Sequence, residues 1–217
     1  MAIDRAGEAA AGPGRRRRRD GALRRDAVLD AGLAVFSTLG LHGASLDQIA
    51  ERAGLSKTNL LYYFASKEAL YLAVLQRVLT VWLDPLQALD AGSEPADALK
   101  AYIRAKMTLS RDAPQASRLF CLEIVQGAPL LRAELAGPLR ALVDAKAAVL
   151  GSWIAQGRIG PHDPRHLIFS IWAITQHYAD FAVQVEAVTG RDLSDPDFFE
   201  ATVASTQRLV LAGLGLA

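Results

Sequence analysis

The order of apolar and polar positions predicts a chain that is helical throughout. Between Arg24 and Gly40 the apolar residues recur at helical spacing, and Gly40 is placed to end the run. These apolar positions are Ala27, Val28, Ala31, Ala34 and Val35. No stretch alternates apolar with polar residues as a half-buried strand does, and no Asn-Gly or Asp-Gly turn joins two apolar stretches. We therefore expect an all-α fold.

Two short helices joined by a glycine turn are predicted next. Ser45 and Gln48 have the spacing of a capping box before a two-turn helix, and Gly54 supplies the left-handed residue for a sharp turn. Ser56 is then placed as the N-cap of a second short helix that ends near Phe64. Helix, turn and helix within about twenty residues make a helix-turn-helix, although the same pair also occurs as a purely structural unit in all-helical domains.

The remainder of the chain predicts longer helices. Ser66 is expected to cap a helix from Lys67 to Trp82, which Pro85 would stop. Asp163 is expected to cap another, with Pro164 at its first position. The further helices are expected over residues 96–111, 115–127, 130–156 with an interruption near 137–138, 165–188, and after Asp195-Pro196. Apolar surface on the last two helices suggests a homodimer formed by pairing them with their copies.

Charge is distributed unevenly along the chain. The net charge is +1, yet residues 1–25 hold eight arginines against three acids, and five of the arginines are consecutive (Arg15 to Arg19). A basic arm on a slightly acidic body suits a protein that grips phosphates at one end, although a solubilising tail has the same composition. We expect three parts: a disordered basic arm (1–20), a helix-turn-helix domain (21–66), and a helical ligand-binding and dimerisation domain (67–217).

Several classes of function are disfavoured. Cys121 is the one cysteine, so no internal disulfide forms and a reducing cytoplasm is expected. We expect no signal peptide and no membrane-spanning segment. His162 and His166 have the spacing of a metal pair but no third ligand nearby, so we expect no metal. Acid pairs such as Asp180 with Glu186 could serve an enzyme, but no phosphate loop or nucleophile elbow accompanies them, and we expect no catalytic residues and no cofactor.

The second short helix carries the candidate DNA contacts. Lys57 and Asn59 are the natural readers of base edges, because lysine donates to guanine and asparagine pairs with adenine. Thr58 shares their helical turn. Phosphate contacts are expected from Ser45, Tyr62, Tyr63 and Lys67, with one tyrosine ring alternatively packing into the core. The arginine run would add phosphate contacts and a steep salt dependence.

The segment from Ser45 to Leu70 resembles the TetR family of bacterial transcriptional repressors. The resemblance lies in the Ser-Leu-x-x-Ile-Ala, Ala-Gly-x-Ser, Leu-Tyr-Tyr-Phe and Ser-Lys-Glu-x-Leu elements. It implies an all-helical homodimer whose heads bind operator DNA and whose C-terminal domain holds a small-molecule pocket. Residues 56–64, 114–121, 127–131 and 175–190 further resemble regulators of pyrimidine utilisation, which implies release from DNA by uracil or thymine. A repressor of this family that responds to another effector, such as a hydrophobic drug controlling efflux, is the alternative.

A pyrimidine dione needs a flat apolar face and polar groups at its edge. Phe169, Trp172 and Gln176 follow one another on one helix face and would offer a platform with an amide at its end. Arg118 and Glu123 would supply the opposing edge contacts. Two alternatives remain for these residues: an ordinary ion pair between Arg118 and Glu123, and a purely structural place for Trp172 in the core.

Overall fold

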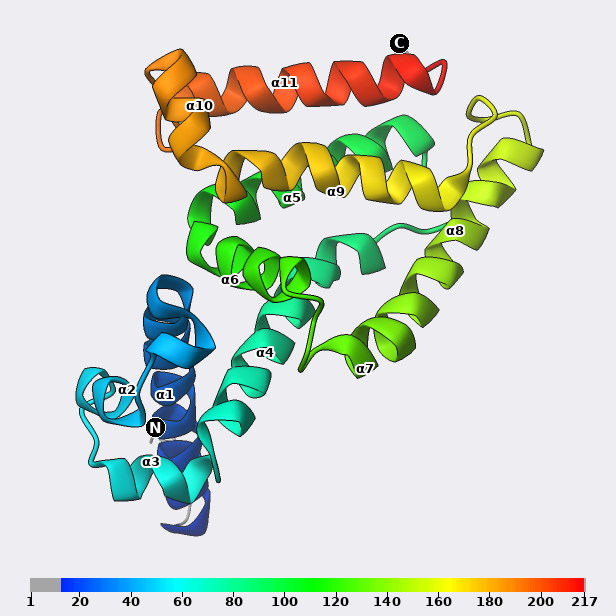
Figure 1. Ribbon diagram of the computed structural model, residues 1–217. Coiled ribbons are helices and arrows are strands. Elements are labelled where there is room, and N and C mark those ends of the chain that lie inside the picture. The colour runs from blue at the N-terminus through cyan, green and yellow to red at the C-terminus, as the bar shows by residue number, and fades with distance from the viewer. Residues whose placement is uncertain (1–12, 217) are drawn as a thin grey trace, which may run out of the picture.

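The computed structural model describes residues 13–216, together with the side chains of residues 19–216, and every regular element in them is helical, which confirms the all-α prediction. Figure 1 shows α1 to α3 as a head below the larger helical body. The elements are α1 (Pro13–Gly43), α2 (Leu46–Arg52), α3 (Lys57–Tyr63), α4 (Lys67–Gln87), α5 (Pro95–Asp112), α6 (Pro114–Val125), α7 (Arg132–Glu134), the π-helix η1 (Leu135–Leu139), α8 (Arg140–Ala155), α9 (Pro164–Asp180), α10 (Ala182–Thr189) and α11 (Pro196–Gly213).

The head is a helix-turn-helix whose ends are fixed by the predicted caps. The Ser45 backbone N–H donates to the Gln48 side chain at 2.9 Å, and the Ser45 hydroxyl accepts from the Gln48 N–H at 3.2 Å, which completes the capping box. Gly54 has φ 66°, the left-handed conformation that the turn requires. The Ser56 hydroxyl accepts from the Asn59 N–H at 3.2 Å. Local chemistry therefore sets the geometry of α2 and α3.

The first helix begins earlier than predicted. It starts at Pro13, so residues 13–20 are helical and the expected disordered arm over 1–20 is wrong for that part. Proline is favoured at a helix start and arginine is a good helix former, so the run joins the helix that follows. Residues 1–12 and the side chains of residues 13–18 lie outside the described part of the structure. Gly40, with φ 66°, does break the helix as predicted, and a short turn continues to Gly43.

Two other helix ends differ from the prediction. Helix α4 does not stop before Pro85 but continues to Gln87, because Leu86 and Leu89 are buried and hold the last turn in the core. Proline costs one backbone hydrogen bond there, and the burial of these residues offsets that cost. The predicted helix over 165–188 is divided at Phe181 (φ −113°, ψ 30°), whose ring stacks on His177 with 5.0 Å between centroids. The break at Phe181 has no glycine or proline beside it that would predict it.

Helix α4 is long and apolar enough to cross a membrane by length and composition alone. Its residues Val74, Leu75 and Trp82 nevertheless lie in the protein core, at 0%, 0% and 6% exposure. The helix leaves the head, runs diagonally into the body and packs against α1, α5, α6 and α8 (Figure 1). We therefore assign α4 as a core helix that joins head and body.

Two hydrophobic clusters divide the molecule, and α6 belongs to the cluster of the head. The first cluster joins Val28 and Leu60 of the head to Ala116 and Leu119 of α6. The second holds the body together through α5, α8, α9 and α11. In Figure 1, α6 lies between the head and α9, and it contacts α1 and α4 as well as α5 and α9. The core of the head thus extends across the predicted boundary at residues 66 and 67.

Candidate DNA interface and effector site

Helix α3 presents a polar surface anchored from beneath. Leu60 is fully buried, which fixes the rotation of the helix, while Lys57, Thr58 and Asn59 are exposed on its first turn. The Tyr62 ring is 85% exposed. An ammonium, a hydroxyl, an amide and a phenol therefore face solvent along one short helix, and these are the groups that read DNA bases and phosphates.

Lys57 already has an ionic partner within the head. Its Nζ donates to Asp47 Oδ2 at 2.9 Å, and the two side chains are 50% and 69% exposed. An exposed pair of this kind contributes about 0–1 kcal/mol, so the lysine can exchange the carboxylate for a DNA acceptor at little cost. The pair is a feature that the sequence pattern did not reveal.

The other residues predicted to contact phosphates also have roles inside the head. Ser45 takes part in the capping box, and Lys67 Nζ donates to the Ala44 carbonyl at 2.9 Å. The Tyr63 ring packs against the core and meets the Tyr62 ring edge-on, 5.4 Å away. One tyrosine thus packs inward, as the alternative held, and the phosphate contacts of these residues stay predictions. The phosphate contacts predicted for Arg15 to Arg18 involve side chains that lie outside the described part of the structure.

A small cavity of about 30 Å³ lies in the body where α4, α5, α6 and α9 meet η1. Two of the five predicted ligand-binding residues, Trp172 and Gln176, line it. The remaining walls are Leu79, Trp82, Leu83, Lys106, Phe120 and Leu139. The cavity is therefore mostly apolar, with a few polar groups at defined places, as small-molecule sites are.

Lys106 is the most unusual group in this wall. Its side chain is 2% exposed, and its Nζ lies 4.0 Å from the centroid of the Trp82 ring. Burial lowers the pKa of Lys106 to about 7, while the negative charge of Asp180 acts in the opposite direction. Within the described residues the buried Trp82 indole N–H has no hydrogen-bond partner. A buried cation and an unpaired donor at one cavity call for a ligand with acceptor atoms.

The other indole of the cavity is held in place. Trp172 Nε1 donates to the Tyr102 hydroxyl at 2.6 Å, and burial raises the pKa of Tyr102, which keeps that hydroxyl neutral. Trp172 therefore offers a fixed apolar face to the cavity. Phe169 lies one turn earlier on α9, is 49% exposed, and does not line this cavity; with Arg165 and Trp172 it lines a neighbouring surface hollow. The predicted three-residue platform is thus reduced to Trp172 and Gln176.

Arg118 and Glu123 do not reach the cavity walls. Arg118 is exposed, whereas Glu123 is buried and its Oε1 accepts from the N–H groups of Leu130 and Leu131 at 2.8 and 3.1 Å. Five residues on a helix correspond to a rotation of about 140° beyond a full turn, so the two side chains point away from each other. Within the described residues they form no ion pair. Glu123 instead closes the loop after α6.

Lys106 was not among the predicted ligand-binding residues, although the sequence pattern of its helix indicated an unusual position. Helix α5 buries one stripe, and Lys106 occupies a position of that stripe. The buried residues are Pro95, Leu99, Tyr102, Ile103, Lys106, Met107 and Ser110. A lysine in the apolar register of a helix is rare unless it has a partner or a function. The position of Lys106 among the apolar residues of the helix, and not a sequence motif, would have identified it as a site residue.

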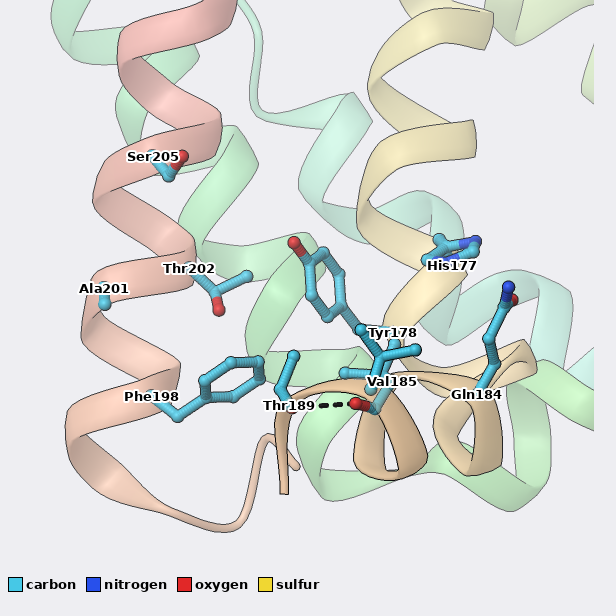
Figure 2. A pocket seen from close by; sticks show the side chains of 10 residues that line it. His177, Tyr178, Gln184, Val185, Thr189, Phe198, Ala201, Thr202 and Ser205 are labelled. Carbon is cyan, nitrogen blue, oxygen red and sulfur yellow. Dashed lines mark hydrogen bonds between the residues drawn. The ribbon is translucent and has the colours of Figure 1, made fainter. Parts of the chain in front are cut away.

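A second hollow of about 420 Å³ opens between the end of α9, α10 and α11 (Figure 2). Tyr178, Val185 and Phe198 form its apolar walls, and Gln184 lies at its rim. It is open to solvent, and neighbouring apolar residues such as Val188 are strongly exposed. It is a surface feature of the C-terminal helices and not an enclosed site.

Comparison with known proteins agrees with both halves of the fold. Residues 28–74 match the family described as bacterial regulatory proteins, tetR family, and residues 75–217 match the YcdC-like protein, C-terminal region. The chain is 56% identical over 199 residues to the HTH-type transcriptional regulator RutR of Escherichia coli (strain K12), covering 92% of this chain and 94% of that protein.

Solved structures share the fold. A transcriptional regulator from Streptomyces coelicolor matches with a TM-score of 0.67 at 28% identity, over 89% of this chain and 99% of that one. AibR, solved with isovaleryl coenzyme A and operator DNA, matches with a TM-score of 0.59 at 21% identity, over 72% of this chain and 85% of that one. The matched families are transcriptional regulators and not enzymes. The chain belongs to the TetR family of helix-turn-helix transcriptional regulators.

Proposed function

We propose that this protein is a homodimeric repressor of pyrimidine utilisation genes, and that uracil or thymine releases it from its operator. The observation that carries the proposal is the mostly apolar cavity lined by Lys106, Trp82 and Gln176, together with the Trp82 N–H that has no partner within the described residues. The chain's 56% identity to RutR supports the same specificity. Such a protein would act in the cytoplasm, where the bacterial chromosome lies.

The chemistry of the cavity fits a ring with two carbonyl groups. Within the described residues, neither the Lys106 ammonium nor the Trp82 N–H donates a hydrogen bond to a protein acceptor, and the Gln176 amide can both donate and accept. A pyrimidine dione brings two acceptors and two N–H donors on a flat ring that can lie against Trp172. A hydrophobic drug would leave the buried Lys106 amine and the Trp82 N–H without acceptors, which disfavours the efflux alternative.

The cavity as it stands is smaller than the proposed ligand. A volume of about 30 Å³ holds no more than a few water-sized groups, so a pyrimidine ring requires its walls to move. A ligand that fits only after such a movement binds the two conformations with different affinities. That difference is what allows it to shift the equilibrium between DNA-bound and free protein.

Pairing of two copies through the C-terminal helices is supported by apolar surface on them. Phe181, Val183, Val188 and Leu209 are between 52% and 79% exposed, although each is a large apolar residue. Two heads in one dimer can meet two half-sites about one helical turn apart. Replacing both Val183 and Val188 by aspartate is expected to shift the light-scattering mass from dimer to monomer. A dimer unaffected by these charges would place the interface elsewhere.

Calorimetric titration tests the ligand assignment. Uracil and thymine are expected to bind, and Gln176→Ala is expected to weaken uracil binding by roughly tenfold to a hundredfold, because removing one edge partner costs about 1–3 kcal/mol. Gln184→Ala is the matched control, since that amide lies at the open hollow instead of the cavity. Equal affinity of wild type and Gln176→Ala for uracil would refute this placement of the site.

The Asp47–Lys57 ion pair is expected to limit the affinity of the protein for nonspecific DNA. Asp47→Asn frees the lysine and removes one negative charge from the DNA-facing surface, so affinity for random duplex DNA is expected to rise about twofold to fivefold at low salt. Asp97→Asn changes the same charge on α5, far from the head, and should leave this affinity unchanged. Fluorescence anisotropy measures both variants. An unchanged affinity in Asp47→Asn would show that the pair does not restrain Lys57.

A further inference from the structure

One hydrogen bond joins the helix of the effector cavity to the helix shared with the head. Asp180 is the last residue of α9, one turn beyond Gln176, and its Oδ1 accepts from the Ser117 hydroxyl on α6. Ser117 has no exposed surface. A buried hydroxyl with a carboxylate acceptor is a strong, charge-assisted link between the two helices.

Helix α6 in turn packs into the hydrophobic core of the head. Ala116 and Leu119 flank Ser117, are 5% and 0% exposed, and pack in the same hydrophobic cluster as Val28 and Leu29 of α1. Tightly packed cores transmit displacement because they do not deform continuously. A shift of α6 relative to α9 therefore becomes a shift of α1 relative to the body.

The Asp180 carboxylate, which accepts this hydrogen bond, is influenced by the charge of Lys106 in the cavity wall. Burial raises the pKa of Asp180, while Ser117, Cys121, Lys106 and His177 act to lower it. Lys106 is the only one of these that also lines the cavity. A ligand that accepts a hydrogen bond from the Lys106 ammonium changes the surroundings of the cation whose field acts on Asp180. Ligand binding thus changes the electrostatic environment of the carboxylate that holds α6.

We infer that the Ser117–Asp180 hydrogen bond couples the effector cavity to the DNA-binding head, with both residues acting as positioning residues and not as ligand contacts. The inference rests on the proposed function, since an effector must bind the cavity. Coupling is the factor by which saturating effector weakens operator affinity, commonly 5–150-fold in allosteric proteins. By reciprocity, operator DNA weakens effector binding by the same factor.

The Ser117→Ala variant tests this inference when its affinity for each ligand alone and its coupling factor are measured separately. Affinities for uracil and for operator alone are expected to stay within about threefold of wild type, while the coupling factor falls to nearly 1, the value for uncoupled sites. Ser110→Ala is the matched control. Its buried hydroxyl also joins α9, through the Thr175 carbonyl at 2.8 Å, but it comes from α5, whose fully buried apolar residues, such as Tyr102 and Met107, belong to the hydrophobic cluster of the body. Wild-type coupling is expected in Ser110→Ala.

A second variant, Asp180→Asn, and a hydrogen-exchange measurement test the coupling independently of Ser117→Ala binding data. Asp180→Asn retains a carbonyl acceptor for Ser117 but loses the carboxylate charge on which Lys106 acts, so its coupling is expected to lie between those of wild type and Ser117→Ala. Hydrogen exchange needs no effector: operator DNA is expected to change exchange of the Gln176–Asp180 amides in wild type but not in Ser117→Ala. Full coupling and an unchanged exchange response in Ser117→Ala would overturn the inference. Failure of uracil to bind wild type, with the exchange response intact, would count against the effector assignment alone.

Discussion

Replacing Lys106 by methionine is expected to weaken uracil binding by about a hundredfold and to make the free protein more stable. The fold buries a cation whose pKa falls to about 7. Keeping that cation charged costs on the order of a few kcal/mol, partly offset by the Trp82 ring and by Asp180. Methionine has similar length and no charge, so it removes this cost and also the donor that the ligand requires.

The lowered pKa of Lys106 also determines how protein stability and uracil binding depend on pH. The folded value lies below the ordinary value of 10.5, so the cost of the buried cation is fully present below pH 7 and disappears as pH rises from 7 to 10.5. The stability advantage of Lys106→Met over wild type is therefore expected to be large at pH 6 and smaller at pH 9. Uracil binding by wild type is expected to weaken as pH rises through about 7, because the ammonium loses its proton.

Denaturant unfolding at pH 6 and pH 9 measures the stability effect, and calorimetry measures the binding effect. Lys100→Met, at an exposed position of the same helix, is the matched control and is expected to change neither. A Lys106→Met protein that is less stable than wild type at pH 6, or that binds uracil normally, would show that Lys106 is not an uncompensated donor in the ligand site.

Replacing Asn59 by alanine is expected to reduce specific operator affinity by about tenfold to a hundredfold while leaving affinity for random DNA nearly unchanged. A bidentate contact of asparagine with adenine discriminates by about 1–3 kcal/mol. Tyr62→Phe removes only a hydroxyl from a strongly exposed ring and is expected to weaken both kinds of binding equally, as a phosphate contact would. Equal losses in Asn59→Ala would show that Asn59 contacts the backbone instead of a base.

The local features of the fold could be predicted because single residues determine them. Ser45, Ser56, Asp163 and Asp195 each cap a helix through their own side-chain oxygen, and the sequence pattern predicted each of these starts. Such contacts span two or three residues, so no knowledge of the tertiary structure is needed.

The remaining features depend on contacts between distant residues. Burial of Leu86 keeps α4 helical past Pro85, and stacking of Phe181 on His177 accompanies the break after α9. The effector site could be predicted only in part for the same reason. Trp172 and Gln176 share one helix face, but Lys106 and Trp82 come from two other helices. Their meeting is a property of packing and not of spacing along the chain.

Titration of uracil into a preformed protein–DNA complex tests the central claim most directly. A duplex that the protein selects from a random-sequence pool serves as the labelled operator, and anisotropy reports its release. We expect uracil and thymine to release the DNA, whereas cytosine, with an amino group in place of one carbonyl, should do so only at far higher concentration. An operator complex that stays intact at uracil concentrations shown by calorimetry to saturate the protein would contradict the central claim.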